Sequence, residues 1–236
     1  MPVPGFDSLP NCALKCIVAA LGGGICALAD QTCLCTSELF QSNATACIAE
    51  SCTRVEALAT KNITMAQCGQ PVLNRSGELV AISLGMYIVA AMFVMIRLGY
   101  KVFVIRIHFN MDDWFVLASA VATAPAIFVN VFGTTVNGLG QDIWNLPPHK
   151  ISASIKYFWI DICLYFLDTT LTKLSIISFY IRTFPSSNVQ RLLWATFTIT
   201  GAWGTAFVLV GIFQCQPISH FWTQWDGLQT GQCASP

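Results

Sequence analysis

Charge is what this sequence lacks most: only 10% of its 236 residues are Asp, Glu, Lys or Arg, while 55% are hydrophobic. Soluble domains carry about 25% charged residues, so the composition argues against an ordinary soluble domain. The 12 basic and 12 acidic residues balance each other. We therefore expect no nucleic-acid partner, which would need a basic excess, and no acidic disordered tail.

Catalytic motifs are missing as well. The run at residues 22–24 is Gly-Gly-Gly but lacks the lysine and the spacing of a phosphate-binding loop, and no nucleophile elbow or histidine pair occurs. We therefore expect no enzymatic activity.

Residues 1–7 also lack the basic and apolar regions of a secretory signal. Either the start is incomplete or already processed, or the first membrane helix carries the targeting information.

Long apolar runs, by contrast, are abundant. Four of them come close to or exceed the length that crosses a bilayer core of about 30 Å. They cover residues 79–96, 114–133, 157–181 and 192–213. Four such runs with few charges between them disfavour the alternative of buried core helices. The sequence thus predicts an α-helical transmembrane bundle of four helices over residues 78–236, with a tail over 214–236.

Cysteines gather in the first part of the chain, which has no long apolar run. Eight of the 11 lie between Cys12 and Cys68, a density typical of a disulfide scaffold in an oxidising compartment. Two four-thiolate zinc sites are the alternative, but this segment contains no histidine. Three N-glycosylation sequons also fall in this part, at Asn43, Asn62 and Asn74. We predict an extracellular domain over residues 1–77.

The basic residues of the short loops predict the orientation. Five of them flank the first and third connections: Arg97, Lys101, Arg106, Arg182 and Arg191. The second connection holds two, Lys150 and Lys156. Because basic loops tend to stay in the cytoplasm, the N-terminal segment, the second loop and the tail are expected outside. The predicted location is the plasma membrane or cell surface, in contact with lipid.

Eight cysteines allow 105 pairings, which helical geometry narrows. A helix places Cys12 and Cys16 on one face, and Cys47 and Cys52 roughly on one face of a second helix. Two antiparallel helices joined through these faces, together with one local loop, could give the pairs Cys12–Cys52, Cys16–Cys47 and Cys26–Cys33, leaving Cys35 and Cys68. In the tail, Cys215 and Cys233 could pair across a short loop.

The order of these cysteines and of their neighbours resembles the fungal CFEM domain over about residues 8–70. The matching segments are Leu-Pro-Asn-Cys12-Ala-Leu-Lys-Cys16, Cys26-Ala-Leu-Ala-Asp30-Gln-Thr-Cys33-Leu-Cys35, Cys47, Cys52 and Cys68. The resemblance implies the pairing above, with Cys35–Cys68 as its fourth bridge. It also implies a small all-α, disulfide-rich ectodomain, a helical basket with a flat apolar face that can bind haem.

In haem-binding members of this family, an aspartate three residues before the fourth cysteine is the axial iron ligand, and the matching residue is Asp30. A carboxylate is a hard oxygen donor and suits ferric iron. The resemblance therefore implies haem as a cofactor, with Leu28, Ala29 and Leu34 able to face the macrocycle. The alternative is that Asp30 is a turn or helix-cap residue without a ligand.

Three later segments resemble the fungal rhodopsin-like integral membrane proteins, including CFEM-headed receptor-like members. They are Arg97…Arg106…Met111-Asp112-Asp113-Trp114, Lys173-Leu-Ser-Ile-Ile-Ser-Phe179-Tyr180-Ile-Arg182-Thr-Phe184-Pro185 and Phe213-Gln-Cys215-Gln-Pro217-Ile-Ser-His-Phe-Trp222. The resemblance also supports a Cys215–Cys233 bridge. That family has seven helices, so we expect this chain to be a fragment, a shortened form or a degenerate copy, without G-protein coupling of its own.

Charged residues inside the third run need partners, because an ionisable group at membrane depth costs about 3 kcal/mol or more when unpaired. Asp168 is the best candidate for a buried polar contact, structural more than ligand-binding, while Asp161 is close enough to the outer end to be hydrated. Lys173 is expected to snorkel or to pair across helices. Asp112 and Asp113 are expected to cap or charge the start of the second helix, with contact to a partner as the second interpretation. Cys163 is expected to be a small packed hydrophobe.

Three interpretations of function remain. The first is a receptor or sensor at the cell surface, with an extracellular head that binds haem or another ligand and a cytoplasmic signalling partner. The second is a haem or iron acquisition protein that is anchored by its helices. The third is a structural or adhesive surface protein whose head binds no cofactor.

Overall fold

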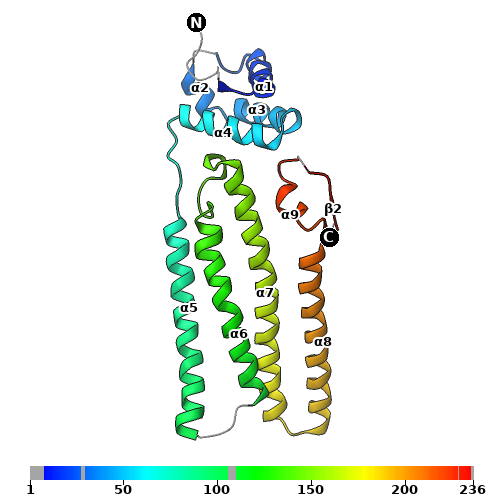
Figure 1. The fold of residues 1–236 in the computed structure, drawn as a ribbon. Helices are drawn as coiled ribbons and strands as arrows, with labels where there is room; N and C mark the ends of the chain where they lie inside the picture. Colours follow the sequence, from blue (N-terminus) through cyan, green and yellow to red (C-terminus); the bar gives the residue numbers. More distant parts are fainter. Residues whose placement is uncertain (1–7, 28–29, 106–109, 228, 235–236) are drawn as a thin grey trace. The chain divides into compact units, whose positions relative to one another are not determined.

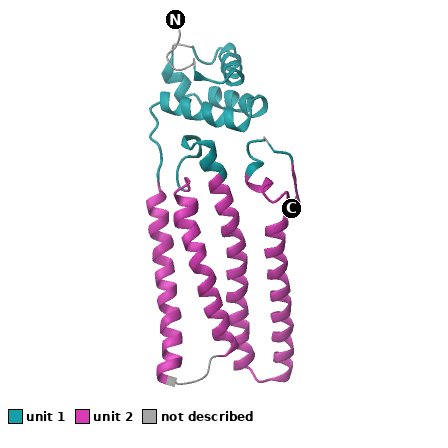
Figure 2. Ribbon diagram, in the orientation of Figure 1, with its two compact units in different colours: residues 1–74, 140–152, 223–230 teal, residues 75–139, 153–222, 231–236 magenta. Residues whose placement is uncertain are grey.

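The structure is a computed structural model that describes residues 8–27, 30–105, 110–227 and 229–234, and most of these residues are helical (Figure 1). The chain divides into two compact units, coloured separately in Figure 2. The first, called the head unit, comprises Met1–Asn74, Gly140–Ser152 and Thr223–Thr230. The second, called the membrane unit, comprises Arg75–Leu139, Ala153–Trp222 and Gly231–Pro236.

Short helices build the head unit. In chain order they are α1 (Asn11–Gly22), α2 (Gln31–Thr36), α3 (Glu38–Ser51), α4 (Arg54–Gln67) and the 3₁₀ turn η4 (Ile143–Asn145). Side chains just before three of them satisfy exposed backbone N–H groups, which sets where each helix begins. Asp30 caps α2, Ser37 caps α3, and Thr53 forms a reciprocal capping box with Glu56 at the start of α4.

Disulfides hold these helices together. The four bridges of the head unit are Cys12–Cys52, Cys16–Cys47, Cys26–Cys33 and Cys35–Cys68, the pairs that the CFEM resemblance implies. The first two link α1 to the region of α3, as the helical spacing suggests. The apolar core beside them is small, with Leu9, Ile17 and Phe40 buried around Cys26. A core of this size needs covalent support, and one bridge typically contributes about 2–4 kcal/mol.

Longer helices build the membrane unit. They are α5 (Ser76–Gly99), α6 (Met111–Phe128), α7 (Pro148–Thr183, which begins in the head unit), and α8 (Ser187–Phe213). Wider π-helical turns extend α5 over Tyr100–Ile105 (η2) and α6 over Val129–Thr135 (η3). The turn after α6 follows Pro125, whose missing N–H interrupts the helical hydrogen bonds.

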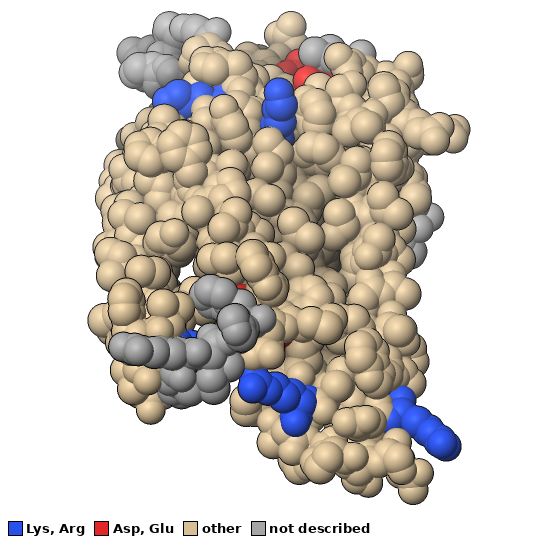
Figure 3. Space-filling view, turned by 60° about the horizontal axis from the view of Figure 1, so that its bottom comes forward, with Lys and Arg blue, Asp and Glu red and all other residues tan. Residues whose placement is uncertain are grey.

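These helices are long and apolar enough to cross a membrane. Among the described residues, four qualify: Ser76–Val104, Met111–Thr135, Pro148–Thr183 and Ser187–Phe213. Each contains one of the four predicted spans, so the expectation of a small helical domain followed by four membrane helices is confirmed. The structure lengthens every span, because its polar ends continue the helix beyond the apolar run. Figure 3 shows a surface made almost entirely of uncharged residues, as lipid contact requires.

Close backbone approach brings α7 and α8 together. A Cβ atom on Gly204 of α8 would collide with the side chain of Thr170 on α7, so the two helices meet where no side chain intervenes. The indole N–H of Trp159 donates a 2.8 Å hydrogen bond to the carbonyl of Gly211 in the same pair. Small residues at such contacts are typical of helix packing in membranes.

The C-terminal segment folds back on itself after α8. Strand β1 (Cys215–Gln216) pairs antiparallel with β2 (Gln232–Cys233), and Cys215 is bonded to Cys233. The short helix α9 (His220–Thr223) lies between them. Among the cysteines of the described segments, Cys163 on α7 is the free one.

Candidate functional site

Asp30 stands at the start of α2 on the surface of the head unit. Its Oδ1 accepts a 3.0 Å hydrogen bond from the backbone N–H of Cys33, so the residue does cap the helix. The side chain is exposed. Its second carboxylate oxygen takes part in no hydrogen bond or ion pair with the part of the chain that the structure describes. Capping therefore uses one oxygen of Asp30 and leaves the other accessible.

This donor fits the haem iron that the CFEM resemblance implies, since one accessible carboxylate oxygen is enough for an axial ligand to ferric iron. Leu28 and Ala29 lie outside the described residues. Leu34 is partly buried and packs against the core of the head unit, and its expected place against a macrocycle stays a prediction. Within the described segments, no three His, Cys, Asp or Glu side chains gather as metal ligands.

A cavity of about 460 Å³ also lies within the head unit, between α2, α3 and α4. Its walls are mostly apolar, and Phe40 and Ile48 line it. Asp30 is not among its lining residues, although the next residue, Gln31, is. Sequence reasoning did not find this cavity, because the space depends on how three helices pack and not on any local motif.

The asparagines of all three sequons are exposed. Asn43 lies on α3, Asn62 on α4 and Asn74 just before α5. An exposed side chain is what attachment of a bulky, hydrophilic glycan requires. The expected modification sites are therefore sterically accessible on the head unit.

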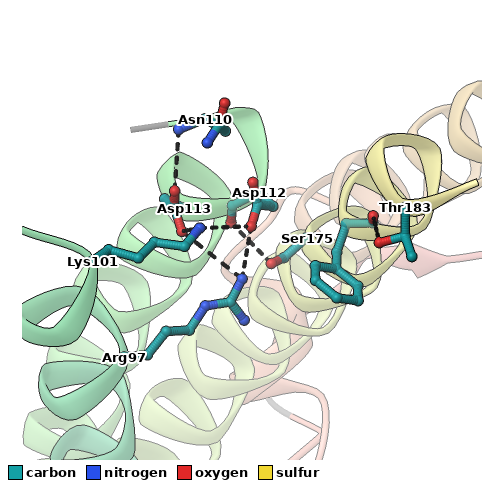
Figure 4. Close-up of polar contacts among 8 residues, drawn as sticks. Arg97, Lys101, Asn110, Asp112, Asp113, Ser175 and Thr183 are labelled. Carbon is teal, nitrogen blue, oxygen red and sulfur yellow. Dashed lines mark hydrogen bonds and ion pairs between the residues drawn. The ribbon is translucent and has the colours of Figure 1, made fainter. Parts of the chain in front are cut away.

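Four charged side chains meet where α5 ends and α6 begins (Figure 4). Arg97 lies 2.8 Å from Asp112, and Lys101 lies 2.6 Å from Asp113, measured between nitrogen and carboxylate oxygen. Cross-contacts of 3.3 Å from Lys101 to Asp112 and 3.8 Å from Arg97 to Asp113 complete the set. The two acids are buried, and we call the four residues the charge cluster.

Backbone contacts tie the charge cluster to its surroundings. Asp113 Oδ2 accepts the backbone N–H of Asn110 at 3.1 Å, so Asp113 does cap α6 as the sequence predicts. The hydroxyl of Ser175 on α7 donates to the carbonyl of Asp112 at 3.0 Å. Sequence reasoning used Arg97 and Lys101 for topology, and Arg97 also for the family resemblance, but predicted no pairing with the two acids. Their i,i+4 spacing at the end of one apolar run, facing two acids at the start of the next, was the available signal.

Asp168 makes the interhelical contact that was expected of it. Its Oδ1 accepts hydrogen bonds from Ser119 Oγ at 2.5 Å and from Thr123 Oγ1 at 3.1 Å, both on α6. Ser119 Oγ also lies 3.1 Å from the hydroxyl of Thr172. The group is a hydroxyl-lined polar contact between α6 and α7, which favours the structural interpretation of Asp168.

The other charged residues of α7 contact neighbouring helices too. Asn130 Nδ2 donates to Asp161 Oδ2 at 3.5 Å. The ammonium of Lys173 lies 5.7 Å from the ring centroid of Trp203 on α8, a cation–π distance. Lys173 thus reaches across helices, and the ring face partly replaces water around its charge.

These features define a class: a multi-pass helical membrane protein with a small disulfide-linked helical head. Residues 96–236 match the fungal rhodopsin domain, and residues 5–69 match the CFEM domain. The chain belongs to the fungal rhodopsin domain family and carries a CFEM domain at its N-terminal end, as the motifs predict.

One relative is Satratoxin biosynthesis SC1 cluster protein 4 from Stachybotrys chartarum (strain CBS 109288 / IBT 7711). It is 36% identical to this chain over 63 residues, which are 26% of this chain and 24% of that protein. The chain therefore spans about a quarter of the length of this relative. No solved structure matches the chain.

Proposed function

We propose that the protein is a receptor or sensor of the fungal cell surface, whose CFEM head lies outside the cell and binds ferric haem. The observation that carries the proposal is the accessible carboxylate oxygen of Asp30 on a covalently stapled head. The four helices that are long and apolar enough to cross a membrane anchor the chain there. Haem supplies the iron, and this chain supplies an anionic oxygen donor at a fixed position.

Three features support an outside position of the head. Its eight cysteines are all in disulfides, which persist in oxidising compartments. Its three sequon asparagines are exposed, and N-glycans are added only on the luminal side of the secretory pathway. Arg97 and Lys101, the basic residues of the charge cluster, lie in α5 and its extension η2, at the end that the positive-inside rule puts in the cytoplasm.

Asp30 is a suitable ligand because two local features fix it. The hydrogen bond from the Cys33 N–H orients the carboxylate, and the Cys26–Cys33 bridge restrains the turn in which it lies. An anionic donor stabilises ferric iron more than ferrous iron. Binding should therefore weaken on reduction, which provides a route for release.

Titration of the full chain in lipid nanodiscs with ferric haem tests the proposal. The expected result is a saturating Soret shift at one haem per chain that disappears in Asp30→Asn. The asparagine oxygen still caps α2, so this variant removes the anionic donor and keeps the helix start. Glu50→Gln, which removes an exposed charge elsewhere on the head, is the matched control.

The same titration can contradict the proposal. An equal Soret shift in the wild type and in Asp30→Asn would place haem elsewhere or in the lipid. The absence of any saturating shift at micromolar haem would reject haem as the ligand. Mapping the head disulfides in each variant shows that a lost signal is not a lost fold.

A further inference from the structure

The cavity of the head unit has an aliphatic and aromatic wall that no haem contact accounts for. Phe40, Ala44 and Ile48 of α3 line one side, and Leu58 and Met65 of α4 line the other. Its volume of about 460 Å³ falls within the range of about 300–1,000 Å³ that is usual for small-molecule sites. An apolar molecule would replace water that these walls cannot hydrogen-bond.

Most of the polar groups that line the cavity already donate within the head. Gln31 Nε2 donates to the carbonyl of Gln67 at 2.7 Å, and Gln41 Nε2 donates to the carbonyl of Cys35 at 2.6 Å. The hydroxyls of Thr60 and Thr64 donate to carbonyls of their own helix, α4. These groups hold the walls of the cavity in place. Their donors are used within the head and offer few hydrogen bonds to a ligand.

Besides the hydroxyl of Thr45 on α3, two donors remain, and both come from α4. The Nε2 atom of Gln67 is buried and has no hydrogen-bond partner within the described residues. A buried polar atom without a partner costs about 1–3 kcal/mol, so it calls for an explanation. The second donor is the ammonium of Lys61, which makes no hydrogen bond or ion pair with any described residue and lies 5.9 Å from the Trp144 ring centroid.

The charge of the cavity identifies the kind of ligand. Lys61 is the one charged residue among the described residues that line it, so the site is positive. The lining cysteines Cys35 and Cys68 are bonded to each other, and no described lining residue is His, Asp or Glu. The cavity therefore offers donors to an anion and no ligand to a metal or to haem iron.

We propose that this cavity binds an apolar carboxylic acid of the fatty-acid type. The hydrocarbon chain lies between α3 and α4, and the carboxylate oxygens accept hydrogen bonds from Lys61 and Gln67. Charge-assisted hydrogen bonds of this kind are about twice as strong as neutral ones. Asp30 does not line this cavity, so the proposal gives the head one position for haem and another for an acid.

Photo-crosslinking of the full chain in phosphatidylcholine nanodiscs tests this proposal. The probes are a long-chain fatty acid that carries a diazirine and its methyl ester, which has the same chain without the charge. Labelled peptides are then identified by mass spectrometry. The expected result is saturable labelling of α3 and α4 by the acid, about tenfold stronger than labelling by the ester.

Variants then identify the donors. Lys61→Met and Gln67→Leu keep the bulk of each side chain and should each lower acid labelling of α3 and α4 by about tenfold. Lys15→Met, which removes an exposed positive charge on α1 outside the cavity, should leave labelling unchanged. Asp30→Asn should also leave it unchanged, which separates this proposal from haem binding.

Several results would overturn the proposal. Equal labelling of the wild-type head by acid and ester would show that charge plays no role. Labelling confined to α5–α8 would show that the probe only follows the lipid. If Lys61→Met were labelled as strongly as the wild type, with its head disulfides intact, the Lys61 ammonium would not be a donor to the acid.

Discussion

The Lys101 ammonium lies 2.6 Å from Asp113 Oδ1, and the Asp113 side chain is completely buried while that of Lys101 is 20% exposed. The pair joins the end of α5 to the start of α6, and Arg97 and Asp112 neutralise each other beside it. A buried carboxylate in an apolar bundle is stable only when it is paired and hydrogen-bonded. The charge cluster therefore fixes the register of α5 relative to α6, which contacts between apolar faces alone would not fix.

Removal of one member of this pair should weaken the bundle. We expect Lys101→Met to lower the free energy of unfolding by about 2 kcal/mol, because Asp113 would stay buried without its nearest cation. Unfolding by SDS in mixed micelles, followed by circular dichroism, measures the change. Arg191→Met removes an exposed cation from α8 and should have little effect.

A double-mutant cycle with Asp113→Asn isolates the pair. The two losses should be far from additive, because the second substitution removes the stranded charge that the first one leaves. Additive losses within about 0.5 kcal/mol would mean that the pair contributes no coupling.

The head should lose stability in acid through Glu56. Hydrogen bonds from the backbone N–H and the hydroxyl of Thr53 hold the pKa of Glu56 below its ordinary value of 4.5. A folded-state pKa that is lowered gives stability above the unfolded pKa, and this stability is lost as the pH falls through the folded pKa. The midpoint of thermal unfolding of the head should therefore decrease below about pH 4.5.

Glu56→Gln provides the control for this prediction. Glutamine can still accept from Thr53 in the capping box but does not titrate. The difference in midpoint between wild type and variant should shrink as the pH is lowered from about 6 to about 3. A constant difference across this range would contradict the role of the Glu56 charge.

Gly204 should tolerate no side chain. A Cβ atom at this position would collide with Thr170, whereas one at Gly201 would lie 4.0 Å from Leu174, an ordinary contact. We expect Gly204→Ala to destabilise the α7–α8 pair by about 1–3 kcal/mol and Gly201→Ala to be nearly neutral. Detergent unfolding of both variants measures the difference, and equal effects would contradict the close approach.

Much of the fold could be predicted because its signals are local or covalent. Apolar runs reveal membrane helices directly, since lipid solvates them along their whole length. The spacing of Cys12, Cys16, Cys47 and Cys52 reflects the helices that carry these residues. The ends of the helices could not be predicted as well, because polar residues at each end stay helical once capped, as at Asn110 and Asp113.

The candidate sites also differ in how far the sequence could predict them. Asp30 stands within a cysteine motif, so the sequence could assign it both as a cap and as a ligand, and the structure shows the cap. The charge cluster joins residues from consecutive helices, and the head cavity depends on packing among three helices. Neither follows from spacing alone, because tertiary contacts decide which side chains meet.

The position of the head is the central claim, since haem capture and sensing from outside both require it. The most direct measurement is mass spectrometry of the native protein after enzymatic removal of N-glycans in heavy-oxygen water, which marks each occupied asparagine. The account predicts marked Asn43, Asn62 and Asn74 together with alkylation-resistant cysteines from Cys12 to Cys68. Unmarked asparagines with freely alkylated thiols throughout that segment would contradict it.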